Sequence, residues 1–427
     1  MRPAARVIVA AAAVACALAG CAPGSGVDPD DPDQVEVFTW WATGTEKVGL
    51  DALVDVFTEQ YPDIRFVNAT VAGGAGSNAK NALAQRLDDG DPPDTFQAHA
   101  GAELTDYIEA GQLQDLSGFY AAKELDDVFP ETLIDLLTVD GAIYSVPTNI
   151  HRANVVWANT EVLAAAGIDP NVPPAGLDAW IDDLRRLREE GVAVPLALGT
   201  EWTQLQLFET VLLADLGAEG YSGLWTGETP WDAPGVAAAV AHYDELLDYV
   251  NSDFAGLDWD TATQIVVTGN AGYIVMGDWA EVAFAQAGWT YGDEYTTFPV
   301  PGTSGVFDFL ADSFVLTVGA PHPVATEDWL TTLSSVEGQQ AFNLAKGSIP
   351  ARTDVDSSEY PAYQQTALAS FAEDTIVSSL AHGAAADIAW SSAISDAVSR
   401  FGTDRNADAF RQSLLAAAAA NAPAPAG

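Results

Sequence analysis

The first folded part of the chain reads as a strand, a helix and a second strand in close succession. The run VEVFTW (35–40) alternates as a strand does, and DIRFVNATV (63–71) is a second extended run. Between them, apolar residues recur at helical spacing from Leu50 to Phe57, and the helical pattern stops at Pro62. Two strands joined by one helix are expected to lie parallel, with a right-handed crossover. This opening therefore predicts an α/β fold.

The rest of the chain predicts more than one lobe. Its 427 residues are 48% hydrophobic, which is ample for two cores. The stretch GAIYSVPTNIHRANVVWAN (141–159) starts as a strand, bends at Pro147 and resumes as an apolar run, as expected of a crossing between lobes. The middle of the chain is mainly helical, while AGYIVMG (271–277) and FDFLADSFVLTV (307–318) predict further β structure. Helices close the chain, and we expect a frayed tail over 422–427.

The N-terminus has the pattern of an export signal. Arg2 and Arg6 precede an apolar stretch that is too short to span a membrane, and small residues lead up to Cys21. This pattern matches bacterial lipoprotein signals, in which cleavage leaves an N-terminal cysteine that carries lipid. The alternative is an ordinary secretory signal, and it is disfavoured because Cys21 is the only cysteine outside the apolar stretch. We expect a signal peptide over 1–20, a flexible tether over 21–33, and an extracytoplasmic protein anchored to the membrane through lipid.

Charge and residue spacing exclude several classes of function. The formal net charge of -45 makes nucleic acid an implausible partner, because its phosphates would be repelled, and it favours a soluble monomer. The five histidines follow no metal-binding spacing, so we expect neither a metal nor another cofactor. GGAGSNAK (73–80) lacks the spacing of a phosphate loop, and we find no G-x-S-x-G elbow.

Aromatic and polar residues stand at the ends of the early strands. Trp40 and Trp41 follow the first strand and precede polar residues, so at least one indole is expected beside solvent. Ligands of open α/β sheets bind beyond the carboxyl ends of the strands, which is where these indoles and the nearby Glu46 fall. Gln97 and His99 are two apart at the end of another predicted strand and should point the same way. The alternative for His99 is an ordinary buried histidine in the core.

Later segments contain a similar set of residues. Asp278 and Trp279 follow an apolar strand, where Asp278 is also suited to cap a helix. Asp312 lies inside an apolar strand pattern, where an unpaired carboxylate would cost several kcal/mol, so it needs a partner or a ligand. Lys346 precedes Gly347 and has the alternative of being an ordinary lysine at a helix end.

Four more residues complete the set. Trp202 and Trp259 lie just before helices, and for Trp202 packing at the helix start is the alternative. Asn149 falls at the bend of the predicted crossing, and His382 lies among small and apolar residues. Indole faces stack on the C–H faces of a pyranose, while carboxylates, amides, lysine and histidine bind its hydroxyls. A few such contacts would give roughly micromolar affinity, about -8 kcal/mol.

Several long stretches resemble one family, the extracellular solute-binding proteins of bacterial ABC sugar importers. Within that family the chain is most similar to glucose/galactose/mannose-binding proteins, over essentially the whole mature chain. The stretches are WWATGTE, NATVAGGAGSNA, DGDPPDTFQAHAG, IYSVPTNIHRANVVW, LALGTEWTQ, VMGDWAE, GVFDFLADSF, KGSIPAR and SLAHGA.

The resemblance implies a periplasmic-binding-protein-like α/β fold, with two lobes joined by a multi-strand hinge and the ligand in the cleft between them. It implies an N-lobe over 34–148 and 304–332 and a C-lobe over 149–303 and 333–421, with crossings near 149, 304 and 333. The implied sugar contacts are Trp40, Trp41, Glu46, Gln97, His99, Trp259, Trp279, Asp312, Lys346 and His382. WWATGTE is one residue longer than the family spacing before the acid. Asn149, Trp202 and Asp278 are expected just behind the contacting residues.

The expected function is therefore a lipid-anchored receptor that captures a monosaccharide, glucose or another hexose, and delivers it to ABC permease subunits. No bond would be broken. Two alternatives remain open at this point: an exported glycoside-cleaving enzyme on a two-lobed scaffold, and a sugar-sensing receptor that is not coupled to transport. Acidity does not decide the first, because 61 acidic residues always offer a pair of carboxylates.

Overall fold

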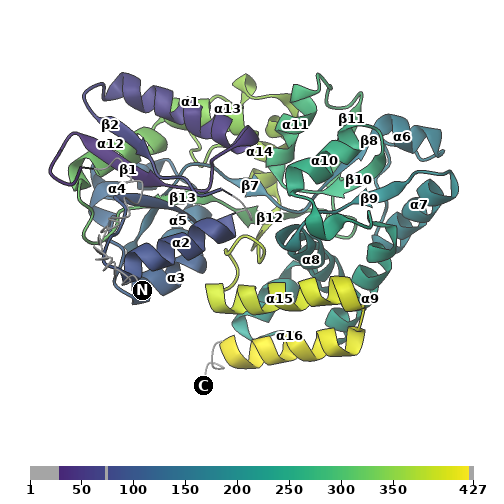
Figure 1. Cartoon of the computed structure of the whole chain (residues 1–427). Coiled ribbons are helices and arrows are strands. Elements are labelled where there is room, and N and C mark those ends of the chain that lie inside the picture. Colours follow the sequence, from purple (N-terminus) through teal and green to yellow (C-terminus); the bar gives the residue numbers. More distant parts are fainter. Residues whose placement is uncertain (1–27, 73–75, 423–427) are drawn as a thin grey trace, which may run out of the picture.

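The computed structural model describes residues 28–72 and 76–422, which form two α/β lobes beside each other (Figure 1). The expected signal peptide over 1–20, the expected lipid attachment site Cys21 and the tail residues 423–427 lie outside the described residues. No helix within the described part is both long and apolar enough to cross a membrane.

The first lobe is built on a mixed five-stranded sheet in the order β2-β1-β3-β13-β6. Its strands are β1 (Gln34–Phe38), β2 (Arg65–Asn68), β3 (Thr95–His99), β6 (Ser145–Pro147) and β13 (Asp312–Val315). β1 pairs parallel with β2 and β3, whereas β13 runs antiparallel to β3 and β6. Helix α1 (Gly44–Gln60) joins β1 to β2, so the predicted strand–helix–strand unit is confirmed.

The helices and small strands of the first lobe surround this sheet. They are α2 (Ser77–Asp88), α3 (Glu103–Glu109), α4 (Ser117–Lys123), α5 (Glu131–Leu137), β4 (Thr138–Val139), β5 (Ala142–Ile143), α12 (Pro323–Ser334) and α13 (Val336–Lys346). Their apolar faces close a core in which Phe57 meets Trp329 edge to face, with ring centroids 5.4 Å apart.

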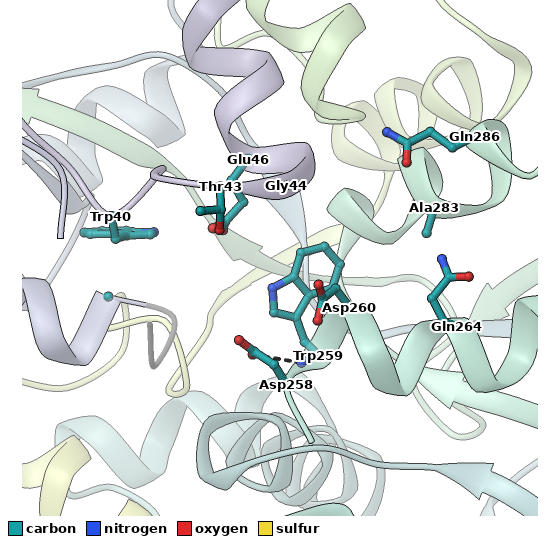
Figure 2. Close-up of a pocket in the computed structure, with 11 residues that line it drawn as sticks. Trp40, Thr43, Gly44, Glu46, Asp258, Trp259, Asp260, Gln264, Ala283 and Gln286 are labelled. Carbon is teal, nitrogen blue, oxygen red and sulfur yellow. Dashed lines mark hydrogen bonds between the residues drawn. The ribbon is translucent and has the colours of Figure 1, made fainter. Parts of the chain in front are cut away.

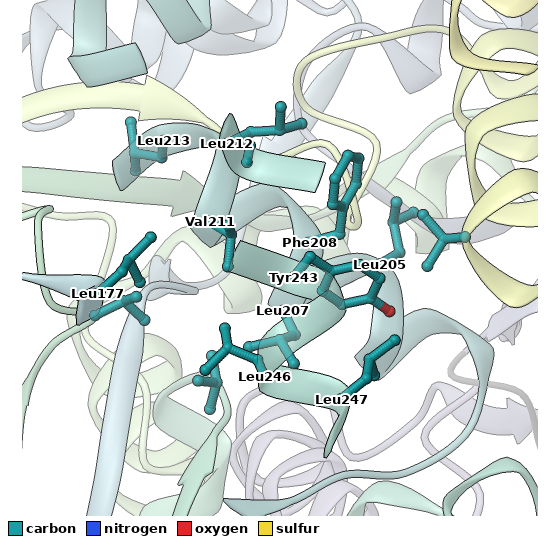
Figure 3. Packing of buried hydrophobic residues seen from close by; sticks show 14 of the residues in the cluster. Leu177, Leu205, Leu207, Phe208, Val211, Leu212, Leu213, Tyr243, Leu246 and Leu247 are labelled. Atoms are coloured by element: carbon teal, nitrogen blue, oxygen red, sulfur yellow. The ribbon is translucent and has the colours of Figure 1, made fainter. Parts of the chain in front are cut away.

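The second lobe has a four-stranded sheet in the order β11-β8-β10-β9. Its strands are β8 (Val155–Asn159), β9 (Val194–Ala197), β10 (Ala271–Val275) and β11 (Tyr295–Pro299). Its helices are α6 (Thr160–Ala165), α7 (Leu177–Glu189), α8 (Glu201–Thr226), α9 (Pro234–Leu246), α10 (Trp259–Val267), α11 (Glu281–Gln286), α15 (Ile388–Asp404) and α16 (Ala407–Asn421). Figure 3 shows the core beneath α8, where Phe208 packs on Tyr243 with ring centroids 5.3 Å apart.

Three short strands in the centre join the lobes. They form a sheet in the order β14-β12-β7, with β7 (His151–Arg152), β12 (Val306–Leu310) and β14 (Thr375–Ser378), near α14 (Ala362–Glu373) (Figure 1). Only Ala311 separates β12 from β13, which belongs to the first-lobe sheet. The stretch 307–318, predicted as one β segment, is therefore two strands in different sheets, because the chain crosses between the lobes there.

The third crossing differs from the prediction. The expected boundary at 333 falls near the end of α12, and α13 beyond it packs on α1 through Phe342, a member of the first core. A Cβ on Gly49 of α1 would lie 3.2 Å from the Phe342 ring, which shows how closely the two helices approach. We therefore propose that the crossing follows α13, near Ile349, which forms a β-bridge with Ile150.

Candidate functional site

A cavity of about 40 Å³ lies between the two lobes, next to the central strands. It is lined by Trp40, Trp41, Glu46, His99, His151, Trp202, Trp259, Trp279, Leu310, Asp312, Lys346 and His382. Nine of the ten side chains predicted to contact a ligand are thus brought together from segments far apart in the sequence. The exception is Gln97. This volume holds roughly three water molecules, since each needs about 10–15 Å³ by this measure. A larger ligand must therefore part the lobes or reach into neighbouring space.

Asp312 lies at the first-lobe side of the cavity with both carboxylate oxygens already bound. Gln97 Nε2 donates to Oδ1 and Asn149 Nδ2 donates to Oδ2, each over 2.8 Å. Burial by itself would raise the pKa of Asp312, but His151, His99 and Lys346 outweigh it and hold that pKa well below its usual range. Asp312 is therefore an ionised acceptor, and Gln97 stands behind it.

His99 is oriented by a partly buried ion pair, in which Glu103 is buried and Lys80 is half-buried. Its Nδ1 lies 2.9 Å from Glu103 Oε2, and the same oxygen lies 2.7 Å from Lys80 Nζ. Burial would raise the pKa of Glu103, but Lys80 and His99 together lower it to about 2. An ionised carboxylate only accepts, so His99 Nδ1 must donate and its Nε2 is left for the cavity, 4.0 Å from Asp312.

The indoles on the second-lobe side form one aromatic wall. The Trp279 ring lies 6.1 Å from Trp202, 6.5 Å from Trp259 and 5.2 Å from His382, measured between centroids. Gly277 supports this wall, because a Cβ at that position would lie 2.2 Å from the Trp279 ring. Any side chain there would displace the indole.

The two tryptophans at the end of β1 are both buried, with 6% of Trp40 and 1% of Trp41 exposed. The expectation that one of them would lie beside solvent is wrong, because Phe342 of α13 packs on Trp41 and His99 packs on Trp40. Gly76 has a φ of +97° and sits against Trp40, where a Cβ would lie 3.0 Å from the ring. The glycine-rich stretch before α2 therefore ends in a residue that supports an indole.

Lys346 and Glu46 face each other across the cavity edge, with Nζ and Oε1 3.8 Å apart. Burial raises the pKa of Glu46 to about 7, although Lys346 acts to lower it. Lys346 ends α13 and precedes the left-handed Gly347, as predicted. Its helix packs on α1, so Lys346 contributes from the first-lobe side and not from the C-lobe as expected.

Asp278 has a different role from the predicted helix cap. It caps neither the short helical turn that it begins nor α11. Its carboxylate instead accepts from the Arg152 backbone N–H over 3.0 Å and from the Tyr363 hydroxyl. Burial raises the pKa of Asp278 to about 7 against the lowering effect of these bonds. Asp278 thus fixes the backbone behind Trp279, next to His151.

Two larger chambers adjoin the inner cavity. The first, of about 390 Å³, shares Trp40, Glu46 and Trp259 with it, and Figure 2 shows Trp40 and Glu46 opposite Trp259 and Asp258. The second, of about 520 Å³, shares Trp202 with the inner cavity. Space therefore continues outward on both sides of the aromatic wall.

Sequence reasoning missed some residues that shape the site. His151 and Leu310 line the cavity, although neither was among the predicted site residues. No sequence pattern predicted a role for Glu103 or Lys80 at the site, because their pairing with His99 depends on how α2 and α3 pack on β3. Within the described ranges no three His, Cys, Asp or Glu side chains are arranged so that they could hold a metal ion.

Comparisons with known proteins agree with this geometry. A family model described as bacterial extracellular solute-binding protein matches residues 41–340. An uncharacterised ABC transporter extracellular-binding protein of Pyrococcus horikoshii is 34% identical, over 93% of this chain and 92% of that protein. A probable sugar-binding periplasmic protein of Brucella melitensis is 32% identical, over 97% and 98%. The xylose/arabinose-binding protein XacG of Haloferax volcanii is 30% identical, over 76% and 71%.

Solved structures show the same fold. A chitin oligosaccharide binding protein superposes with a TM-score of 0.78 at 20% identity, covering 91% of this chain and 98% of that one. The bacterial solute receptor AcbH, described as preferring β-D-galactopyranose, also gives a TM-score of 0.78, at 18% identity over 90% and 97%. The predicted two-lobed, periplasmic-binding-protein-like α/β fold is therefore confirmed.

Proposed function

Because this chain belongs to the bacterial extracellular solute-binding proteins, whose family model covers more than half of it, we propose that it is a receptor that captures a sugar between its two lobes. The observation that carries this proposal is the inner cavity. Indole faces from both lobes converge there with an ionised carboxylate, histidines and one lysine. Aromatic faces stack on the C–H faces of a pyranose, and charged groups make the stronger hydrogen bonds to its hydroxyls.

The ligand in this proposal is a single hexose, glucose or a related sugar. The inner cavity combines polar groups with an aromatic wall, the set that one sugar ring needs, and the lobes would part slightly to admit the ring because the cavity measures only about 40 Å³. The relative from Haloferax volcanii is named for pentoses and the AcbH structure for a galactopyranose, so monosaccharide ligands occur among similar proteins.

Closure of the lobes would be driven by the ligand. A sugar favours the closed form only through contacts that it makes there and not in the open form. Asp312 and His99 would contribute such contacts from the first lobe, and Trp259, Trp279 and His382 from the second. The short central strands are the elements at which the lobes would hinge.

The proposal includes delivery of the sugar to ABC permease subunits by a monomeric, lipid-anchored protein outside the cytoplasm. Relatives named as ABC transporter and periplasmic binding proteins support the transport role.

Lipid attachment at Cys21 rests on the sequence pattern alone. Labelling of expressing cells with a radioactive fatty acid tests it, and a Cys21→Ser variant that is labelled as strongly as the wild type would refute it.

A thermal-shift screen tests the sugar proposal directly. Glucose, galactose, mannose, xylose, arabinose and common disaccharides should be compared at millimolar concentration. We expect at least one hexose to raise the unfolding temperature, because a ligand that binds the native state alone stabilises it. Absence of any shift with all of these sugars would refute the proposal. Sugars recovered unaltered after incubation support a binding protein, and cleaved disaccharides would show a glycosidase instead.

Replacing Trp279 by alanine is expected to weaken hexose binding at least tenfold. Loss of the indole removes a stacking face at the centre of the aromatic wall, and stacked aromatic faces contribute about 1–3 kcal/mol. Calorimetric titration measures the change. Trp289→Ala is the matched control, because Trp289 packs on Phe284 and does not line the cavity. Equal affinity of the Trp279 variant and the wild type would remove Trp279 from the site.

A further inference from the structure

A chain of three buried polar side chains leads from the second-lobe core to the cavity. His382 follows β14 and lines the cavity with its ring. Its Nδ1 lies 2.9 Å from Ser379 Oγ, which lies 3.0 and 3.1 Å from the two carboxylate oxygens of Glu209. Glu209 belongs to α8, and neither it nor Ser379 is exposed at all. Neither Ser379 nor Glu209 takes part in the contacts described so far.

The hydrogen-bond partners of Glu209 favour its ionised form. Besides Ser379 it accepts the backbone N–H of Ala381 over 2.8 Å. Burial raises the pKa of Glu209 to about 7, against the lowering effect of these bonds. The neighbouring Asp308 is also buried, and both of its carboxyl oxygens lack a hydrogen-bond partner among the described residues. Burial, with Glu209 adding to it, raises the pKa of Asp308 well above its usual range, so Asp308 holds the proton and Glu209 carries the charge above pH 7.

An ionised Glu209 fixes the direction of every hydrogen in the chain. A carboxylate only accepts, so the single hydroxyl hydrogen of Ser379 points to Glu209. Ser379 Oγ must then accept from His382 Nδ1. Burial lowers the pKa of His382 well below its usual value, which leaves the ring neutral with only one N–H. His382 Nε2 therefore carries a free lone pair.

We propose that Glu209 is a positioning residue that sets, through Ser379, the tautomer of His382 and thereby makes Nε2 an acceptor for a ligand hydroxyl. The inference rests on the proposed function only for the identity of the ligand. Glu103 likewise accepts from His99 Nδ1 and turns its Nε2 to the same cavity, where His382 Nε2 and the Asp312 carboxylate present acceptors. The ligand must accordingly direct several hydroxyl hydrogens toward these acceptor atoms. This requirement selects polyols and sugars and rejects analogues that lack those hydroxyls.

Glu209→Gln should reverse the direction of the hydrogen bonds between residue 209, Ser379 and His382, while the side chain at 209 keeps its shape. The amide oxygen takes the Ala381 N–H, so the amide NH₂ must donate to Ser379 Oγ. Ser379 then turns its hydrogen to His382 Nδ1, and the ring hydrogen moves to Nε2. At pH 8, ¹⁵N NMR of the labelled imidazole should show Nδ1–H in the wild type and Nε2–H in the variant. Affinity for D-glucose, with D-galactose as a second probe, should fall about tenfold.

Two further variants make the experiment specific. Ser379→Ala breaks the chain, so adding Glu209→Gln to it should produce no further change in the His382 tautomer. Glu219→Gln is the matched control, because Glu219 is an exposed carboxylate in α8, just beyond the kink at Gly217. An unchanged His382 tautomer in Glu209→Gln overturns the proposal. A reversed tautomer with undiminished affinity also overturns it, because Nε2 would then not accept from the ligand.

A titration of the wild type tests the same chain without any mutation. Lowering the pH through about 7 protonates Glu209, which should reverse the His382 tautomer as the glutamine does. The groups that act on His382 are His99, His151, Asp312 and Lys80, and those near Glu209 are Tyr221 and Asp308. A tautomer constant from pH 5 to 8 contradicts the proposal. If the tautomers behave as expected but no sugar binds, the proposed function fails and the role of Glu209 stands.

Discussion

Replacing Asp312 by asparagine is expected to weaken hexose binding by a factor of a hundred or more. Both oxygens of Asp312 accept from side-chain NH₂ groups, of Gln97 and of Asn149. An asparagine has only one acceptor oxygen, so its own NH₂ would face one of these donors. The change also removes the ionised acceptor that the cavity offers to a hydroxyl. A lost hydrogen bond to a charged group costs about 1.5–3 kcal/mol and a buried unpaired donor about 1–3 kcal/mol, and a hundredfold change in affinity is about 2.7 kcal/mol.

Calorimetric titration with the hexose that stabilises the wild type most provides the measurement. Asp354→Asn is the matched control, since Asp354 also accepts two side-chain donors, both from Arg352, but lies at the surface away from the cavity. The control should bind within twofold of the wild type. An Asp312→Asn variant that keeps its native unfolding temperature and binds within threefold of the wild type would show that Asp312 does not contact the sugar.

The sequence predicted which residues belong to the site better than it predicted which of them line the cavity and which lie behind it. Strand ends and a resemblance pointed to nine side chains that now line one cavity. Gln97 shares the predicted strand face with His99, yet it lies behind the cavity lining. Asp312 on the neighbouring strand β13 lies in front of it and accepts a hydrogen bond from its amide. The position of β13 depends on a contact between residues more than two hundred apart in sequence, which local patterns do not report.

The wrongly predicted boundaries of strands and lobes also result from contacts between distant parts of the sequence. Apolar alternation continues through Ala311 although the chain changes sheets there, so periodicity gives no sign of the crossing. The amphipathic pattern of α13 shows that one face is buried but not against which lobe. Packing of Phe342 on Trp41, with ring centroids 4.8 Å apart, decides that question. The same packing buries Trp41, which strand alternation alone left beside solvent.

Replacing Arg152 by methionine is expected to lower the free energy of unfolding by about 3–5 kcal/mol, the usual cost of removing one partner from a buried ion pair. Arg152 lies on β7, and only 7% of its side chain is exposed. Its guanidinium donates to Val306 O over 2.7 Å, to Ser370 Oγ over 2.9 Å and to the carboxylate of Asp374 over 3.2 Å. Its Nε also donates to Asn154 Oδ1 over 2.9 Å. Methionine keeps the apolar stem but leaves all four acceptors without this donor.

Urea unfolding followed by tryptophan fluorescence measures this loss, and Arg185→Met is its matched control. Arg185 also pairs with two carboxylates, of Asp182 and Glu245, but 47% of its side chain is exposed. Exposed pairs of this kind contribute about 0–1 kcal/mol, so the control should unfold almost as the wild type does. Arg152 joins β7 to the start of β12 and to the end of α14, all at the junction of the lobes. A loss below 1 kcal/mol in the Arg152 variant would mean that the central strands are held by their backbone hydrogen bonds and not by this side chain.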